Sequence, residues 1–104
     1  VAEISRALKR LAKSMGVCVI AVSQLNRKCE ERADHKPVIS DLRESGQLEQ
    51  DADTICFVYR HVIYDENADP TKALVLVRKN RGGTIGEIPL QWDGPAQRFT
   101  DGEW

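Results

Sequence analysis

The stretch Val17-Cys18-Val19-Ile20-Ala21-Val22 consists of apolar residues alone. A strand with one solvated face alternates apolar and polar side chains, whereas a parallel strand covered on both faces is apolar throughout. The stretch therefore predicts a buried parallel strand with helices on either side, which is an α/β fold. It is also far too short to cross a bilayer.

The residues before this strand predict a helix. Apolar side chains recur there at helical spacing, at Ile4, Leu8, Leu11, Ala12 and Met15. Gly16 follows the last of them, where a glycine commonly ends a helix, and Lys13 suits the negative end of the helix dipole. Because Val1 carries no helix-start signal, we expect the chain to begin inside this helix.

The residues after the strand predict a loop, a short helix and three further strands. Residues 28–37 are charged and lack a period, which is typical of a surface loop. Asp41, with Glu44 three residues on, indicates a helix-capping box, and Gly46 is expected to break or bend that helix. A turn is expected at 65–70, and the strands are expected at 54–59, 73–77 and 87–92.

The last two strands are expected to form a hairpin with a basic tip. They are joined by residues 80–86, where the pair Gly82-Gly83 permits positive φ and a tight antiparallel turn. Lys79 and Arg81 are two residues apart, so in a strand they project on one face. In an arbitrary protein such a tip is more often a solvated basic turn. The functional alternative is a clamp that reaches a polyphosphate on a neighbouring subunit.

Composition restricts the partners of the chain. Its 104 residues suit one small domain or a piece of a larger one, and 41% hydrophobic residues provide material for a core. Fifteen Lys and Arg against 16 Asp and Glu leave a net charge of -1. No sequence-wide field therefore draws the chain onto nucleic acid, so any contact with DNA must be local.

Cysteine, histidine and phosphate-loop patterns exclude several kinds of site. Cys18 and Cys56 lie in apolar runs, where a thiol is expected to be buried, so a reduced, cytoplasmic setting is expected. His35 and His61 lack a second ligand at metal-binding spacing, so no metal site is predicted. The 104 residues contain no G-x-x-x-x-G-K-[ST] loop. The chain alone is therefore expected not to hydrolyse ATP.

Polar residues follow the apolar strand at its carboxyl end, where open α/β sheets bind their ligands. Gln24 either satisfies backbone groups at the strand end or senses the terminal phosphate or the attacking water. The cations beyond it are candidates for contact with a nucleic-acid backbone, and they are Arg27, Lys28, Arg32, Lys36 and Arg43. Acidic residues lie among them, so charge alone leaves this function open.

Three motifs, in the same order, resemble successive motifs of DnaB-family replicative DNA helicases. They are Ser23-Gln24-Leu25-Asn26-Arg27, then Asp41-Leu42-Arg43-Glu44-Ser45-Gly46-Gln47-Leu48-Glu49-Gln50-Asp51-Ala52-Asp53, then Lys79-Asn80-Arg81-Gly82-Gly83-Thr84-Ile85-Gly86. The resemblance covers nearly the whole chain. It implies the C-terminal portion of a RecA-like P-loop ATPase fold, with parallel strands plus a C-terminal β-hairpin. It also implies a hexameric ring that couples ATP hydrolysis to the unwinding of duplex DNA at the replication fork.

The resemblance assigns roles by position. Gln24 is implied as the phosphate sensor, and Lys79 and Arg81 as the pair offered to the neighbour's nucleotide, with Arg81 as an arginine finger. Arg43, Glu44 and Gly46 are implied to bind the DNA backbone. A contact through the Gly46 N–H is physically reasonable, because a glycine lets a phosphate approach closely. The chain departs from the family at Gly82-Gly83-Thr84, where Asn-Gly-Pro is common, but Arg81 is in place.

The resemblance also implies how the chain is organised and what it works with. Residues 1–104 are expected to form a single partial domain, the C-terminal part of a motor domain whose P-loop half is absent. ATP and Mg²⁺ are expected in the full-length parent and neither in the fragment alone. The expected partners are single-stranded DNA, a homo-hexamer, a primase and a helicase loader. The alternatives are a RecA or RadA-like recombinase motor, and a non-enzymatic module that binds single-stranded DNA or caps a ring.

Overall fold

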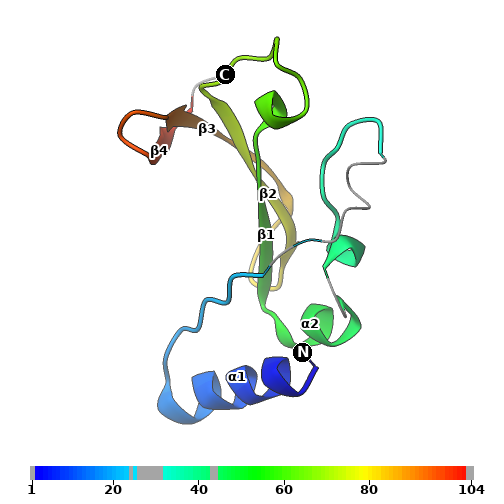
Figure 1. Ribbon diagram of the computed structural model, residues 1–104. Coiled ribbons are helices and arrows are strands. Elements are labelled where there is room, and N and C mark those ends of the chain that lie inside the picture. The colour runs from blue at the N-terminus through cyan, green and yellow to red at the C-terminus, as the bar shows by residue number, and fades with distance from the viewer. Residues whose placement is uncertain (1, 24, 26–31, 43–44, 103–104) are drawn as a thin grey trace.

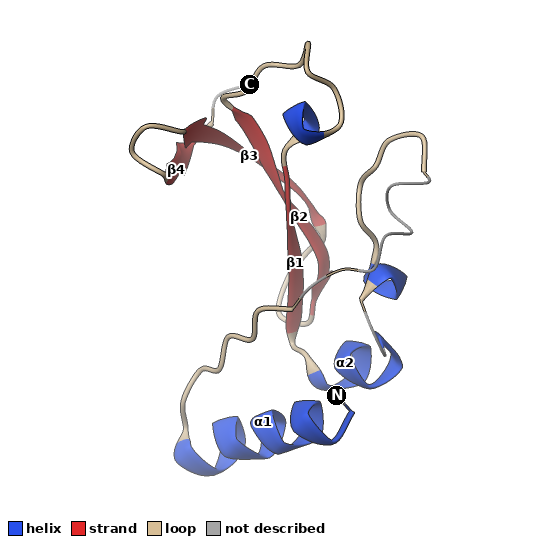
Figure 2. Cartoon of the chain, viewed as in Figure 1, coloured by secondary structure: helices blue, strands red, loops and turns tan. Residues whose placement is uncertain are grey.

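The computed structural model describes residues 2–23, 25, 32–42 and 45–102 (Figure 1). Three predicted site residues, Gln24, Arg43 and Glu44, lie outside the described residues. Two helices lie at the end of the sheet where its first strand begins (Figure 2). The helices are α1 (Ala2–Met15) and α2 (Ser45–Asp51), with short 3-10 turns η2 (Ile39–Asp41) and η3 (His61–Ile63). The strands are β1 (Thr54–Tyr59), β2 (Lys72–Asn80), β3 (Gly86–Asp93) and β4 (Arg98–Asp101).

The sheet is an antiparallel meander in the order β1-β2-β3-β4. The combination of helices and sheet confirms the predicted α/β class and the C-terminal hairpin, but the expectation of parallel strands is wrong for the described part of the chain. The physical reason is connection length. A parallel neighbour needs a crossover of a dozen or more residues, and the turns that link β2, β3 and β4 are too short for one.

The apolar stretch at 17–22 is an extended segment without strand pairing, and it is not the buried strand that its pattern predicts. Ile20 and Val22 are 85% and 97% exposed, and Cys18 is exposed as well. A strand needs a hydrogen-bonded neighbour, and residues 17–22 pair with none of the strands β1 to β4, whose ladders join only one another. Cys56 is also exposed, because β1 turns its even-numbered side chains away from the core.

Helix α1 ends at Gly16, as its sequence predicts. Gly16 has a φ of 63°, and the N–H of Val17 donates to the carbonyl of Ala12 at 3.2 Å, which is the hydrogen bond that closes a Schellman cap. The polar side of α1 meets α2. The Ser5 hydroxyl donates to Asp51 at 2.8 Å and Arg6 donates to Gln47 at 3.0 Å.

The short helix differs from its predicted form. Asp41 does not cap it, because Asp41 ends η2 and its fully buried carboxylate accepts hydrogen bonds from the N–H of Val38 and from Arg32. Gly46 is the second residue of α2 and does not interrupt it. The capping pattern therefore located a polar turn correctly and assigned it to the wrong element.

The core lies on one face of β1 and β2. Burial alternates along β1, so that Ile55, Phe57 and Tyr59 face inward and pack with Leu76 of β2. The partly buried residues around them are Leu25, Ile39, Leu42, Ala52 and Leu74. An isolated antiparallel bridge between Leu25 and Leu42 brings two distant segments onto this core. None of the described helices is long and apolar enough to span a membrane.

Candidate functional site

The tip of the β2–β3 hairpin is shaped by a tight turn. The N–H of Gly83 donates to the carbonyl of Asn80 at 3.2 Å, and the Asn80 side-chain amide donates to the carbonyl of Thr84 at 3.2 Å. A Cβ on Gly83 would lie 2.9 Å from the Asn80 amide nitrogen, whereas neither Gly82 nor Gly83 has a positive φ. Gly83 therefore gives the Asn80 side chain room to lie against the turn, and the positive φ that the sequence predicts at the glycine pair is not observed.

Arg81 begins this turn and forms hydrogen bonds with the end of α2 and with the segment that links α2 to β1. Its N–H donates to the carbonyl of Asp53 at 2.8 Å. Its Nη1 lies 2.7 Å from Oδ1 of Asp53, and its Nη2 donates to the carbonyl of Gln50 at 3.2 Å. The side chain is nonetheless 52% exposed. Its contacts thus set its direction and leave part of the guanidinium open to solvent.

Lys79 reaches the same place from the end of β2. Its ammonium donates to the carbonyl of Glu49 in the last turn of α2. The last carbonyls of a helix have no partner within the helix and carry the negative end of its dipole, so cations are favoured there. The two cations that lie two residues apart in the sequence are brought together at the C-terminal end of α2, as expected of side chains on one face of a hairpin.

Asp53 is the anion among these cations. Besides Arg81 it accepts hydrogen bonds from Lys9 of α1, at 2.8 Å to Oδ1 and 2.9 Å to Oδ2. The hydrogen bond from Lys9 lowers the pKa of the Asp53 carboxyl below its usual value. The positive charges of Lys9, Arg81 and Lys79 lower this pKa further, each by a smaller amount. Asp53 is therefore an ionised carboxylate at neutral pH that joins α1, α2 and the hairpin tip. Sequence reasoning missed it, since 28 residues separate it from Arg81 along the chain.

The candidate DNA-binding segment is described only in part. Gly46 is exposed, and no atom lies within 4 Å of the position that a Cβ would occupy there. A phosphate could therefore approach the backbone at Gly46 closely. Two of the loop cations have intramolecular partners, because Arg32 pairs with buried Asp41 and Lys36 lies 3.0 Å from Glu87 of β3. Those two cations stabilise the fold as well as being candidates for a nucleic-acid backbone.

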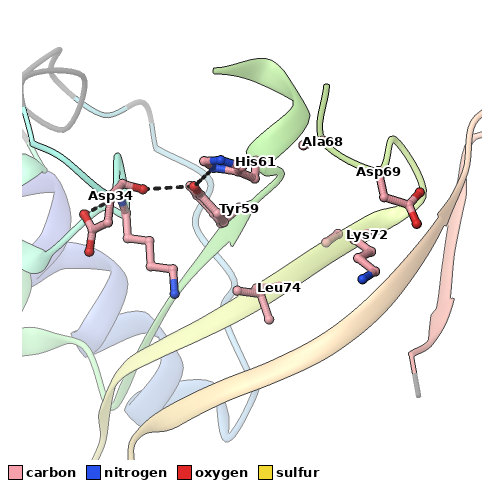
Figure 3. Close-up of a pocket in the computed structure, with 9 residues that line it drawn as sticks. Asp34, Tyr59, His61, Ala68, Asp69, Lys72 and Leu74 are labelled. Carbon is pink, nitrogen blue, oxygen red and sulfur yellow. Dashed lines mark hydrogen bonds between the residues drawn. The ribbon is translucent and has the colours of Figure 1, made fainter. Parts of the chain in front are cut away.

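A separate cavity of about 370 Å³ lies at the far end of β1 (Figure 3). The Tyr59 hydroxyl donates to the carbonyl of Asp34 at 2.9 Å and lies 2.5 Å from Nδ1 of His61. Because the phenol hydrogen goes to Asp34, His61 must donate its Nδ1–H to the Tyr59 oxygen. The lining residues are Asp34, Lys36, Tyr59, His61, Ala68, Asp69, Lys72, Ala73 and Leu74. These residues come from three distant segments, so no local pattern predicts the cavity.

Replacing Tyr59 with Phe tests how much the two hydrogen bonds of the Tyr59 hydroxyl, to Asp34 and His61, stabilise the fold. Tyr59 is buried, so Tyr59→Phe is expected to lower the free energy of unfolding by about 1 kcal/mol at neutral pH. Burial raises the pKa of the Tyr59 phenol above its usual value, and the negative charge of Asp34 raises it further by a smaller amount. The folded state therefore favours the neutral phenol. That contribution is complete below the unfolded pKa and is lost as the pH rises through the folded pKa.

Urea unfolding of the parent and of the Tyr59→Phe variant, at neutral pH and again above the usual tyrosine pKa of 10.0, measures both effects. The stability difference between the two proteins should shrink at the higher pH. Equal stability of the two proteins at neutral pH would show that the hydrogen bonds of the Tyr59 hydroxyl contribute nothing to the free energy of unfolding.

Comparison with solved structures places this geometry in a class. The fold superimposes with a TM-score of 0.92 on a solved ATPase domain that is 45% identical in sequence. The superposition covers 98% of this chain and 36% of the solved one. A second structure, described as a DnaB-like replicative helicase and its interactions with primase, matches with the same TM-score and identity and is covered over 25% of its length. The chain therefore has the fold of part of a helicase ATPase domain.

The family follows from the sequence match. A model of the DnaB-like helicase C-terminal domain matches residues 1–101, and the chain belongs to that family. Replicative DNA helicases DnaB from Buchnera aphidicola and Pasteurella multocida are 56% and 55% identical to it over 100 residues. The chain spans 22% and 21% of the length of these two relatives.

Proposed function

We propose that this chain is the C-terminal part of the motor domain of an ATP-dependent replicative DNA helicase, which unwinds duplex DNA as a hexameric ring at the replication fork. The observation that carries the proposal is the family match across residues 1–101, with curated DnaB helicases 56% identical over 95% of the chain. Within the ring, the chain supplies a phosphate sensor, a DNA-binding segment and an arginine finger that acts in trans.

The hairpin tip supports the role in trans. The chain contains no phosphate loop of its own, whereas Lys79 and Arg81 stand together at the end of a hairpin with half of the Arg81 side chain open to solvent. A planar guanidinium is suited to bind phosphate oxygens in pairs and to stabilise the charge on a phosphoryl group in transfer. These features fit a nucleotide that is held mainly by a neighbouring subunit. Gln24, by its position after the 17–22 segment, is proposed as the residue that senses the terminal phosphate.

ATP and Mg²⁺ are the cofactors proposed for the complete protein. Mg²⁺ would supply positive charge that offsets the charge of the nucleotide's phosphate groups, and its protein ligands would come from the P-loop half. The residues of this chain fit the outer side of such a site, because Lys79 and Arg81 are cationic, adjacent and partly exposed. Their part is to orient and stabilise the phosphates and to help exclude water between subunits.

The segment Arg43, Glu44 and Gly46 is proposed to bind single-stranded DNA in the central channel of the ring. The open space at Gly46 supports this, since a backbone N–H at such a position can donate to a phosphate oxygen. A primase and a helicase loader are the further partners proposed. The solved relative that is described with its primase supports the first of these.

Two other functions make different predictions. A RecA or RadA-like recombinase would exchange strands without unwinding, and the family match argues for the helicase instead. A non-enzymatic module would bind DNA or a ring without any contribution to hydrolysis, and the paired cations at the hairpin tip favour the enzyme.

A test of the helicase function uses the complete protein in which a P-loop half precedes this chain. With ATP and Mg²⁺ we expect DNA-stimulated hydrolysis and unwinding of a forked duplex, and we expect no hydrolysis and only weak DNA binding by the 104-residue chain alone, because ring avidity is lost. Strand exchange without unwinding would replace the helicase with a recombinase. Hydrolysis by the isolated chain would contradict the division of the motor domain proposed here.

A further inference from the structure

We propose that Asp53 is a positioning residue that holds the Arg81 guanidinium in the direction in which it meets the neighbouring subunit's nucleotide. This inference rests on the proposed role of Arg81 in trans. Asp53 lies in the short link between α2 and β1, two residues beyond the end of the helix, and it does not itself reach out from the hairpin tip. Its effect on hydrolysis would therefore pass through Arg81.

The contacts hold the guanidinium at two points. Nη1 of Arg81 bonds to the Asp53 carboxylate at 2.7 Å, and Nη2 bonds to the Gln50 carbonyl at 3.2 Å. Two contacts on one planar group fix its orientation as well as its position. A guanidinium has more N–H donors than these two bonds use, so donors remain for a phosphate. Arg81 is thus held without being fully occupied.

The backbone of Asp53 makes a second, independent contact. Its carbonyl accepts the N–H of Arg81 at 2.8 Å, which anchors the turn whatever the side chain at position 53. A substitution of the Asp53 side chain should therefore leave the hairpin docked and release only the guanidinium. This separation makes the proposal testable without loss of the fold.

Lys9 keeps the carboxylate in place. It bonds to both oxygens of Asp53 from α1, and Oδ1 is shared between Lys9 and Arg81. The Asp53 and Arg81 side chains are 62% and 52% exposed, so in water this ion pair is weak and exchangeable. It gains strength where a subunit interface excludes water. We expect a moderate effect on the rate, about three- to fivefold, which is the size that a weak ion pair supports.

Rings assembled from two kinds of subunit show in which subunit a change at Asp53 lowers the rate of ATP hydrolysis. One kind of subunit has an inactivated P-loop and an intact Arg81, so it donates a finger. The other has an intact P-loop and Arg81→Ala, so it accepts a finger. Every productive site then joins an acceptor nucleotide to a donor finger. Asp53→Asn is placed first in the donor and then in the acceptor, and kcat and KM for ATP are measured per productive site.

Asp53→Asn in the donor is expected to lower kcat about three- to fivefold with KM unchanged, and in the acceptor, whose finger is already missing, to change nothing. Asp53→Glu, which restores the carboxylate, should recover part of the rate. Asp51→Asn is the matched control, because Asp51 accepts bonds from Ser5 and Gln47 at 2.8 and 2.9 Å on the same helices. It should leave kcat at the parental value.

Equal falls in the donor and the acceptor, or no fall in the donor, would overturn the role of Asp53. Failure of the proposed finger itself looks different. In that case the mixed ring with native Asp53 shows no more turnover than rings made of either subunit alone.

Discussion

Arg81→Ala in the complete helicase is expected to lower kcat for ATP hydrolysis about a thousandfold or more, while ATP still binds. The physical reason is that phosphoryl transfer spreads charge over the phosphate oxygens, and a guanidinium in a water-poor interface stabilises that charge mainly in the transition state. Because the neighbouring subunit holds most of the nucleotide under the proposed function, removal of Arg81 should cost little affinity for ATP. Steady-state hydrolysis with single-stranded DNA, together with equilibrium binding of ATP, measures the two effects separately.

Two further variants define the cause of this loss. Arg81→Lys keeps the charge but loses the planar fork, so it should recover only part of the rate. Arg98→Ala is the control, since Arg98 is also an exposed arginine on this sheet and lies 3.9 Å from Asp93 at the opposite end of the hairpin. It should hydrolyse ATP at the parental rate. Normal turnover by Arg81→Ala would exclude the arginine-finger role.

Leu76→Ala is expected to lower the free energy of unfolding by about 2–5 kcal/mol. Leu76 lies in the middle of β2 with 0% of its surface exposed, and it packs with Ile55, Phe57 and Tyr59. Its truncation loses apolar burial and leaves a cavity that a hydrogen-bonded sheet cannot close by collapse. Urea unfolding of the protein, followed by far-UV circular dichroism, measures the change.

Val58→Ala is the matched control for that variant. Val58 lies on the neighbouring strand in register with Val75, but its side chain points away from the core and is 61% exposed. The control should change stability by less than about 1 kcal/mol. If both variants lose the same stability, the core has been assigned to the wrong face of the sheet.

Sequence patterns predicted the local elements well. The mostly apolar run at 54–59 predicted β1 with its observed bounds, and Gly16 ends α1 with the positive φ that its position required. The strand β4 was missed because its residues, Arg98–Asp101, are mostly polar and all exposed, so they carry no apolar period. Trp92 of β3 packs on Phe99 of β4 at 4.7 Å between ring centroids, and that contact is not visible in a short window of sequence.

The candidate site was predicted in part. Lys79 and Arg81 were identified as a pair, and the structure brings them to one helix end. Asp53 was not identified as their partner, although it lies inside the motif at 41–53. The roles of Lys79 and Arg81 remain predictions, as do those of Gln24, Arg43, Glu44 and Gly46. Gln24, Arg43 and Glu44 lie outside the described part of the chain.

The apolar stretch at 17–22 separates what sequence determines from what tertiary structure decides. Its hydrophobicity is a property of the sequence alone, as are the helix before it, the strands β1 to β3 and the glycine turn, because each depends on residues within a few positions of one another. Whether the stretch is buried depends on a neighbouring strand, and in the described chain Ile20 and Val22 have none and face solvent. The Asp53–Arg81 pair likewise exists only because the sheet returns the hairpin tip to the end of α2, and such long-range contacts come from the packing of the whole chain.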